Sequence, residues 1–179
     1  GSSTPSGAAG PSFFVIGAGP EPHPLALRPH FAPNSRVIAA DGGWRLCRQL
    51  AVVPELLIGD MDTLSPEEVR LAESQGIKVE RFPSDKNESD LELAIEAAHT
   101  RGAANLSLVG ALGAQWDHCL ANLLAPLSRC QELGIWARLL TDSAEIYLLS
   151  AGSYRVNVPH GTRVSLAGLS SNVLGLDLE

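Results

Sequence analysis

Short apolar runs recur along the chain and alternate with polar, helix-forming segments. Runs that are apolar over most of their length are typical of strands buried on both faces of a parallel sheet. The run at residues 77–82 instead alternates apolar and charged positions, which predicts a strand near the edge of the sheet. The predicted strands are 13–16, 36–40, 56–58, 77–82, 105–109 and 136–140.

Helix signals fill the gaps between these strands. Ser65 and Glu68 predict a capping box, with proline at the first helical position between them. Ser89 and Glu92 predict a second box, on a helix that begins at Asp90. Further helices are expected at 44–50 and from Asp117, as N-cap, to about residue 133. Six strands that alternate with helices predict a doubly wound α/β fold, with a six-stranded, mostly parallel sheet and helices on both faces.

The pattern changes near residue 144, where short strands follow one another without helices between them. These expected strands are 146–149, 154–158 and 163–166. We therefore predict an α/β domain at 12–143 and a small antiparallel β domain at 144–179, which is truncated or completed by a partner. Residues 1–11 lack the charged and apolar regions of a signal peptide and are expected to form a disordered tail or a cloning remnant.

Composition narrows the class of protein. The chain has 179 residues, 45% hydrophobic and 18% charged, which is typical of a globular protein. A net charge of −7 disfavours a nucleic-acid partner, because no basic excess is present to neutralise phosphates. Three scattered cysteines indicate a reducing compartment. No apolar run approaches the ~20 residues that cross a bilayer, so we expect no membrane partner and a cytoplasmic location.

Candidate chemistry lies where the predicted strands end. Asp60 and Asp62 directly follow the strand at 56–58 and its closing Gly59. Ligands of open parallel sheets bind beyond the carboxyl ends of the strands, and carboxylate oxygens are ligands that Mg²⁺ prefers. The same residues also suit a turn that caps the next helix. On this stretch alone, both interpretations stay open.

A second polar stretch precedes the helix at Asp90. Capping accounts for Ser89 and Asp90, but it does not account for Asp85 and Lys86 beside them. Lys86 suits either a solvated ion pair or a contact with phosphate. Small residues also follow the predicted strand at 13–16. At residues 17–19 they favour either a tight turn or a close approach of the backbone to an anion.

Four motifs stand in order at strand ends, at residues 41–43, 59–63, 85–90 and 110–118. Together with the α/β half and the β-rich half, they resemble the thiamine pyrophosphokinase family over residues 13–179. The resemblance implies a Mg²⁺-dependent transfer of diphosphate from ATP to the hydroxyl of thiamine, giving thiamine diphosphate and AMP. It also implies that the α/β domain at 12–143 is the nucleotide-binding catalytic domain and that the β domain at 144–179 binds the acceptor or a second subunit. Members of the family are dimeric, so the resemblance also implies a homodimer.

The resemblance implies roles for individual residues as well. Asp60, Asp62 and Asp90 would hold Mg²⁺, and Lys86 would contact the phosphates; these four are the expected catalytic residues. Asp90 is also the candidate for the base that accepts the hydroxyl proton. The residues expected to bind the nucleotide are Gly17, Gly19, Asp41, Gly42, Gly43, Asp85, Ser89, Gly110, Gln115, Asp117, Thr141 and Asp142.

The chain departs from the family pattern at several positions. Asn87 and Ser89 stand where the family usually has aspartate and threonine, Gln115 stands where it has arginine, and no tryptophan follows Trp136. The missing arginine and Asn87 keep a non-catalytic, nucleotide-binding regulator as an alternative. The stretch at 60–64 also keeps two enzyme classes open, a haloacid-dehalogenase-like phosphatase and a metal-dependent glycosyltransferase with an Asp-x-Asp motif.

Overall fold

The computed structural model describes residues 9–19, 23–84, 89–112, 116–150, 152, 154 and 158–169, with the backbone alone for 116–123. The strands are β1 (Ser12–Ile16), β2 (Arg36–Ala40), β3 (Leu56–Gly59), β4 (Lys78–Arg81), β5 (Asn105–Val109), β6 (Trp136–Leu140) and β7 (Glu145–Tyr147). The helices are α1 (Pro24–Leu27), with a 3₁₀ turn at Arg28–His30, α2 (Gly43–Leu50), α3 (Pro66–Ser74), α4 (Asp90–Thr100) and α5 (Trp116–Glu132).

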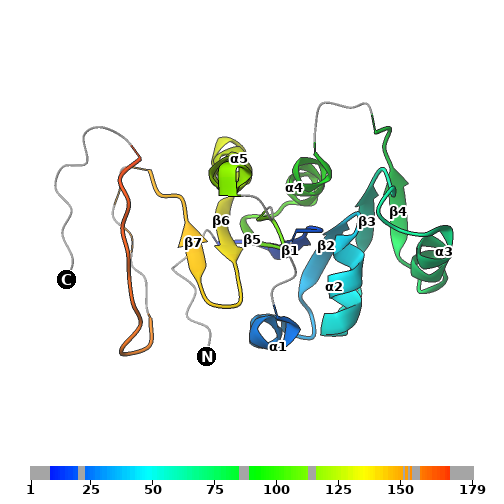
Figure 1. The fold of residues 1–179 in the computed structure, drawn as a ribbon, viewed down its shortest axis with the longest axis horizontal. Helices are drawn as coiled ribbons and strands as arrows, with labels where there is room; N and C mark the ends of the chain where they lie inside the picture. The colour runs from blue at the N-terminus through cyan, green and yellow to red at the C-terminus, as the bar shows by residue number, and fades with distance from the viewer. Residues whose placement is uncertain are drawn as a thin grey trace.

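These strands form one sheet in the order β4-β3-β2-β1-β5-β6-β7 (Figure 1). The strands β1 to β6 pair in parallel, which confirms the predicted α/β fold with a mostly parallel sheet. As predicted from its alternating pattern, β4 lies at the edge. A seventh strand, β7, pairs antiparallel with β6 and places Tyr147 opposite Arg138. The expected β segment after residue 144 therefore begins by extending the main sheet.

Helices cover both faces of the sheet, as expected, with α4 and α5 on one face and α1 and α2 on the other (Figure 1). The central strand β1 is buried on both faces. Phe13 and Val15 pack in one apolar cluster with residues of α4 and α5, whereas Phe14 and Ile16 pack in a second cluster with residues of α2 and α3. A continuous apolar run is the pattern that such a two-sided burial requires.

The order of the strands creates a switch point beside β1. From β1 the chain proceeds outward through β2 and β3 to β4, and α4 then carries it back to β5 on the other side of β1. Loops that leave neighbouring strands in opposite directions open a crevice at the carboxyl ends, where ligands of such sheets bind. The candidate residues after β1, β2, β3 and β5 therefore share one edge of the fold.

Capping explains where two helices start. Ser65 accepts a hydrogen bond from the amide of Glu68 while the Glu68 side chain returns one to Ser65, and Ser89 and Glu92 do the same at α4, as predicted. The helix α5 begins at Trp116, so Asp117 lies inside its first turn rather than at the N-cap.

The two ends of the chain are described only in part. The carbonyl of Pro11, in the predicted tail, accepts hydrogen bonds from the amides of Ala104 and Asn105. Residues 163–166 were expected to form a strand, but they have no strand assignment; a strand needs a partner, and none pairs with them among the described residues. The division at residue 144 stays a prediction. No helix in the described ranges has both the length and the hydrophobicity that crossing a bilayer requires.

Candidate functional site: a carboxylate group at the switch edge

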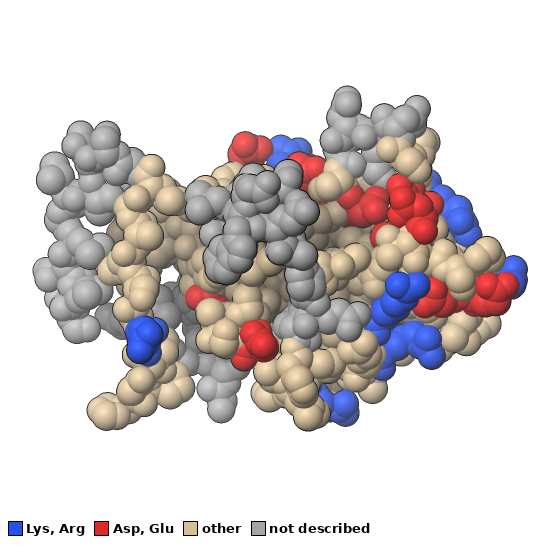
Figure 2. Space-filling model, in the orientation of Figure 1, with Lys and Arg blue, Asp and Glu red and all other residues tan. Residues whose placement is uncertain are grey.

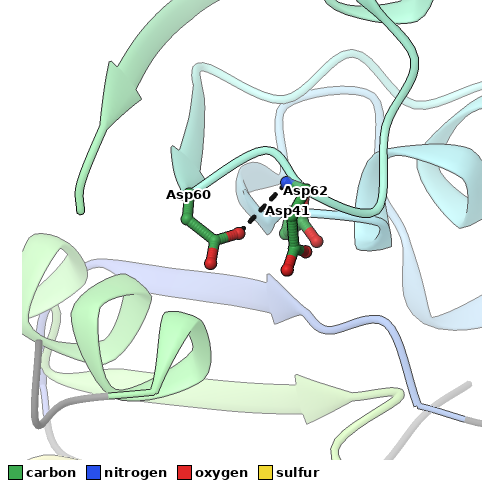
Figure 3. Close-up of side chains that lie close together, drawn as sticks. All are labelled: Asp41, Asp60 and Asp62. Carbon is green, nitrogen blue, oxygen red and sulfur yellow. Dashed lines mark hydrogen bonds between the residues drawn. The ribbon is translucent and has the colours of Figure 1, made fainter. Parts of the chain in front are cut away.

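Three carboxylates meet where β2 and β3 end. Asp41 follows β2, and Asp60 and Asp62 follow β3, which is the neighbour of β2 in the sheet. One oxygen from each carboxylate lies within 4.8 Å of the others (Figure 3). Asp41 is buried, Asp60 is half-buried and Asp62 is exposed, so the group opens to solvent on one side. Figure 2 shows acidic side chains gathered on the visible face around the end of β3.

The backbone of both loops is shaped for this grouping. Asp41 has a φ of 42° and Met61 a φ of 64°, a left-handed conformation that costs a non-glycine residue roughly 1–2 kcal/mol. The Asp41 amide donates to the carbonyl of Ile58 at 2.8 Å, and the Asp62 amide donates to Asp60 Oδ1 at 3.1 Å. These bonds, together with the buried side chain of Met61, hold the strained turns in place.

Asp90 lies beside the group, next to Gly59 at the end of β3. It is the first residue of α4, and its carboxyl carbon lies 2.9 Å from the position that a Cβ on Gly59 would occupy. The Cβ of Asp41 lies 3.1 Å from the same position. Gly59, whose φ is 146°, therefore leaves the space in which the two acidic residues face each other.

The surroundings of Asp41 make its negative charge unfavourable. Burial raises the pKa of Asp41, hydrogen bonds from Thr63 and Gly42 oppose that shift, and the charges of Asp90 and Asp62 raise the pKa further. The oxygen Oδ1 of Asp41 is buried and has no hydrogen-bond partner among the described residues. A buried carboxylate oxygen without a donor, beside other carboxylates, fits a cation better than it fits an empty space.

This donor set suits Mg²⁺, a hard cation that binds oxygen ligands. The predicted metal ligands were Asp60, Asp62 and Asp90. The structure brings Asp60 and Asp62 together with Asp41, which we had expected to bind the nucleotide, and it places Asp90 beside the group rather than within it. The signal for Asp41 was available, because it is a carboxylate directly after a predicted strand.

Replacing Asp41 with asparagine should raise the midpoint of thermal unfolding in EDTA. Because the folded-state pKa of Asp41 is raised, the ionised carboxylate lowers the free energy of unfolding above that pKa, and asparagine removes this cost. For a domain of this size, each kcal/mol of unfolding free energy corresponds to roughly 2–4 °C in the midpoint, so the increase is measurable. Scanning calorimetry in EDTA and in Mg²⁺ measures both midpoints.

The control for this prediction is Asp142→Asn, an exposed aspartate outside the carboxylate group, which should leave the midpoint in EDTA unchanged. Added Mg²⁺ should stabilise the wild-type chain and Asp142→Asn, and stabilise Asp41→Asn much less. A lower midpoint of Asp41→Asn in EDTA would contradict the interpretation of Asp41 as a strained, cation-seeking charge.

Glycines pack the loops after β1 and β5 against each other. The amide of Gly17 donates to the carbonyl of Val109 at 2.8 Å, and that of Gly19 donates to the carbonyl of Gly110 at 2.7 Å. A Cβ on Gly110, whose φ is 62°, would lie 2.5 Å from the carbonyl oxygen of Gly17. Because the amides of Gly17 and Gly19 are already used within the protein, these residues shape the floor of the crevice rather than offer donors to an anion.

The loop after β2 packs against the end of β1 and against the loops after β1 and β3. A Cβ on Gly42 would lie 2.8 Å from the Thr63 methyl group and 3.1 Å from the side chain of Ala18. A Cβ on Gly43 would lie 2.0 Å from the carbonyl oxygen of Ile16. The predicted glycines at 17, 19, 42, 43 and 110 are thus gathered at the switch edge, where a nucleotide is expected to bind.

Other predicted nucleotide-binding residues have structural partners. The Ser89 hydroxyl belongs to the capping box of α4. The Thr141 hydroxyl accepts a hydrogen bond from the Ala144 amide at 2.9 Å in the β6–β7 turn, and Asp142 is exposed in that turn. Asp85, Lys86, Gln115 and the side chain of Asp117 lie outside the described residues, so their expected roles stay predictions.

Comparisons with known proteins point in one direction. The family model described as "Thiamin pyrophosphokinase, catalytic domain" matches residues 29–136. The thiamine pyrophosphokinase of Bacillus subtilis (strain 168) is 22% identical over 165 residues, which cover 92% of this chain and 77% of that protein. Thiamine pyrophosphokinase 2 of Oryza sativa subsp. japonica is 34% identical over 77 residues, which cover 40% of this chain and 29% of that protein.

Solved structures share the fold. The crystal structure of the Bacillus subtilis thiamine pyrophosphokinase superposes with a TM-score of 0.60 at 23% identity, over 72% of this chain and 60% of that chain. The yeast thiamin pyrophosphokinase superposes with a TM-score of 0.57 at 13% identity, over 76% of this chain and 60% of that chain. The match thus spans about 60% of the length of each of these solved structures.

Proposed function

Because this chain belongs to the thiamin pyrophosphokinase family, we propose that it transfers a diphosphate group from ATP to the hydroxyl group of thiamine, with Mg²⁺, giving thiamine diphosphate and AMP. The observation that carries this proposal is the carboxylate group at the switch edge of the sheet. Phosphoryl-type transfers depend mainly on positioning the reactants and on neutralising their negative charge. A group of carboxylates that binds a metal ion at this edge would contribute to both.

The carboxylates of Asp41, Asp60 and Asp62 would hold the metal ion. A bound Mg²⁺ supplies positive charge to phosphate oxygens on which negative charge develops. The unpartnered Oδ1 of Asp41 supports its place in this set. We keep Asp90 as the candidate for the group that accepts the proton of the thiamine hydroxyl, because its carboxyl group lies against Gly59 at the rim of the same site.

The remaining roles concern orientation of the nucleotide. The crowded loops around Gly17, Gly42 and Gly110 would form the floor beneath it, because the absence of side chains there lets these loops pack closely against one another. Lys86 is proposed to contact the phosphates as a point charge. Assembly as a homodimer and a cytoplasmic location remain predictions from the family resemblance and the composition.

Incubating the chain with ATP, Mg²⁺ and thiamine should produce AMP and thiamine diphosphate in equal amounts, because an intact diphosphate leaves ATP. Ion-pair chromatography of the nucleotides and the thiamine esters measures both products in one sample. EDTA should abolish both, since the carboxylates alone leave the phosphate charge uncompensated.

The same assay separates the alternatives. Free phosphate without thiamine would indicate a phosphatase, and turnover only with a nucleotide sugar would indicate a glycosyltransferase. Binding of ATP without any turnover would favour the non-catalytic regulator, which the departures at Asn87 and Gln115 keep as the second candidate. Each of these three outcomes would overturn the proposed diphosphate transfer.

A further inference from the structure

Arg45 makes two kinds of contact beside the carboxylate group. It lies in the first turn of α2, four residues after Asp41. Its Nε and Nη2 atoms donate to the two carboxylate oxygens of Glu68, both at 2.8 Å. Its Nη2 atom also donates to the main-chain carbonyl of Thr63 at 2.9 Å. One guanidinium group therefore joins the start of α2 to the end of the loop that carries Asp60 and Asp62.

The partner of Arg45 is itself fixed. Glu68 accepts a hydrogen bond from the amide of Ser65 at 2.9 Å as part of the capping box of α3. Hydrogen bonds from Arg45, and then from the Ser65 amide, lower the pKa of Glu68 to about 2, so the pair stays ionised at neutral pH. The planar fork of the guanidinium makes this bidentate geometry specific. Arg45 is thus anchored to the start of α3.

Thr63 connects this anchor to the carboxylates. Its hydroxyl donates to Asp62 Oδ1 at 3.2 Å, and a hydrogen bond between Thr63 and Asp41 lowers the pKa of Asp41. The carbonyl that Arg45 holds therefore belongs to the residue whose side chain contacts the carboxylates from both loops. Because Asp62 is exposed and lies beyond the last residue of β3, the sheet itself does not fix its position.

We propose that Arg45 is a positioning residue of the metal site, which holds Thr63 through its carbonyl and so keeps the carboxylates of Asp41 and Asp62 at the separation that binds a divalent cation. This inference rests on the metal site of the proposed function. It predicts that Arg45 affects metal affinity although it does not touch the metal. Losing such an outer partner typically weakens metal binding about 10- to 100-fold.

The chain offers a matched control for an ordinary surface ion pair, which contributes little. Arg36 and Glu55 form a second bidentate pair, with Nε–Oε2 and Nη2–Oε1 distances of 3.0 Å. The side-chain exposures are similar, 41% and 33% for this pair against 43% and 22% for Arg45 and Glu68. Arg36 begins β2 and Glu55 precedes β3, so this pair bridges β2 and β3 at the ends of these strands that are remote from the carboxylates.

The experiment measures the affinity of the full chain for Mn²⁺ alone, by electron paramagnetic resonance of the free ion, in Arg45→Met, Arg36→Met and Asp62→Asn. Arg45→Met should raise the dissociation constant about tenfold, while Arg36→Met should leave it unchanged. Arg45→Lys should fall between Arg45→Met and the wild type, because lysine presents one nitrogen in place of the fork. Extra Mg²⁺ should restore AMP production by Arg45→Met, since the loss is in metal binding.

The outcomes separate the inference from the proposed function. If the wild-type chain does not bind Mn²⁺, or if Asp62→Asn binds it as well as the wild type does, the proposed metal site is wrong. The inference about Arg45 is then overturned with it. If the wild type binds Mn²⁺ and Arg45→Met binds it equally well, only the role of Arg45 is wrong. Should thermal unfolding show that Arg45→Met is not folded, Arg45→Lys decides, and a wild-type affinity in that variant overturns the inference.

Discussion

Asp62→Asn should lower the rate of AMP formation from ATP and thiamine by about a hundredfold or more, while the fold is retained. Asparagine keeps the size of the side chain and an oxygen that accepts the Thr63 hydroxyl, which lies 3.2 Å from Asp62 Oδ1. It removes the charge that would bind the metal directly, and metal ions contribute several kcal/mol of charge stabilisation to such reactions. Initial rates at saturating Mg²⁺ measure the effect.

Glu73→Gln is the matched control for this prediction. It also neutralises one exposed carboxylate, but Glu73 lies in α3 and outside the carboxylate group. Its rate should equal that of the wild-type chain, and circular dichroism should show that both variants are folded. Near-normal activity of Asp62→Asn at all Mg²⁺ concentrations would show that Asp62 does not hold the catalytic metal.

Gly43→Ala should destabilise the chain by about 3 kcal/mol or prevent folding, the upper range for overpacking in a core. The added methyl group would lie 2.0 Å from the carbonyl oxygen of Ile16 and 3.0 Å from the carbonyl carbon of Gly17. These are backbone atoms at the end of β1, the central strand, so they have no side-chain rotamer with which to move aside. Urea titration followed by circular dichroism measures the change in the free energy of unfolding.

Gly76→Ala serves as the comparison for Gly43→Ala. Gly76 has a φ of 79° and no atom within 4 Å of the position of an added Cβ, so only backbone strain opposes the substitution, at roughly 1–2 kcal/mol. Gly43 lacks that strain and would ordinarily gain helix propensity from alanine. A Gly43→Ala variant as stable as the wild type would mean that α2 shifts freely on β1, and the position of Asp41 would then not depend on this contact.

The fold was largely predictable because buried parallel strands leave a clear pattern. Strands at the centre of the sheet, such as β1, are covered on both faces and therefore appear as continuous apolar runs. The run at 77–82 alternates instead, and it forms β4 at the edge of the sheet, where a strand is less deeply buried. The helix α1 has only four residues, too few to show a helical period, and it was not predicted.

The site was predictable only in part, because its grouping depends on strand order. Asp41 and Asp60 are distant in sequence and meet because β2 and β3 are neighbours, which periodicity does not reveal. The left-handed backbone at Met61 has no signal in the residue type, since such a conformation usually favours glycine. Arg45 was missed because its role depends on a side chain that reaches across to Thr63 and Glu68.

The amides of Gly17 and Gly19 donate hydrogen bonds to the carbonyls of Val109 and Gly110, and these bonds affect the free energy of ligand binding. They continue the pairing of β1 with β5 past the last strand residues, so the floor of the crevice is ordered when the sheet folds. A ligand that settles on it loses little free energy to immobilising this part of the protein. If the proposed function holds, discrimination among nucleotides falls to side chains around the rim, and variants there should change selectivity without rebuilding the floor.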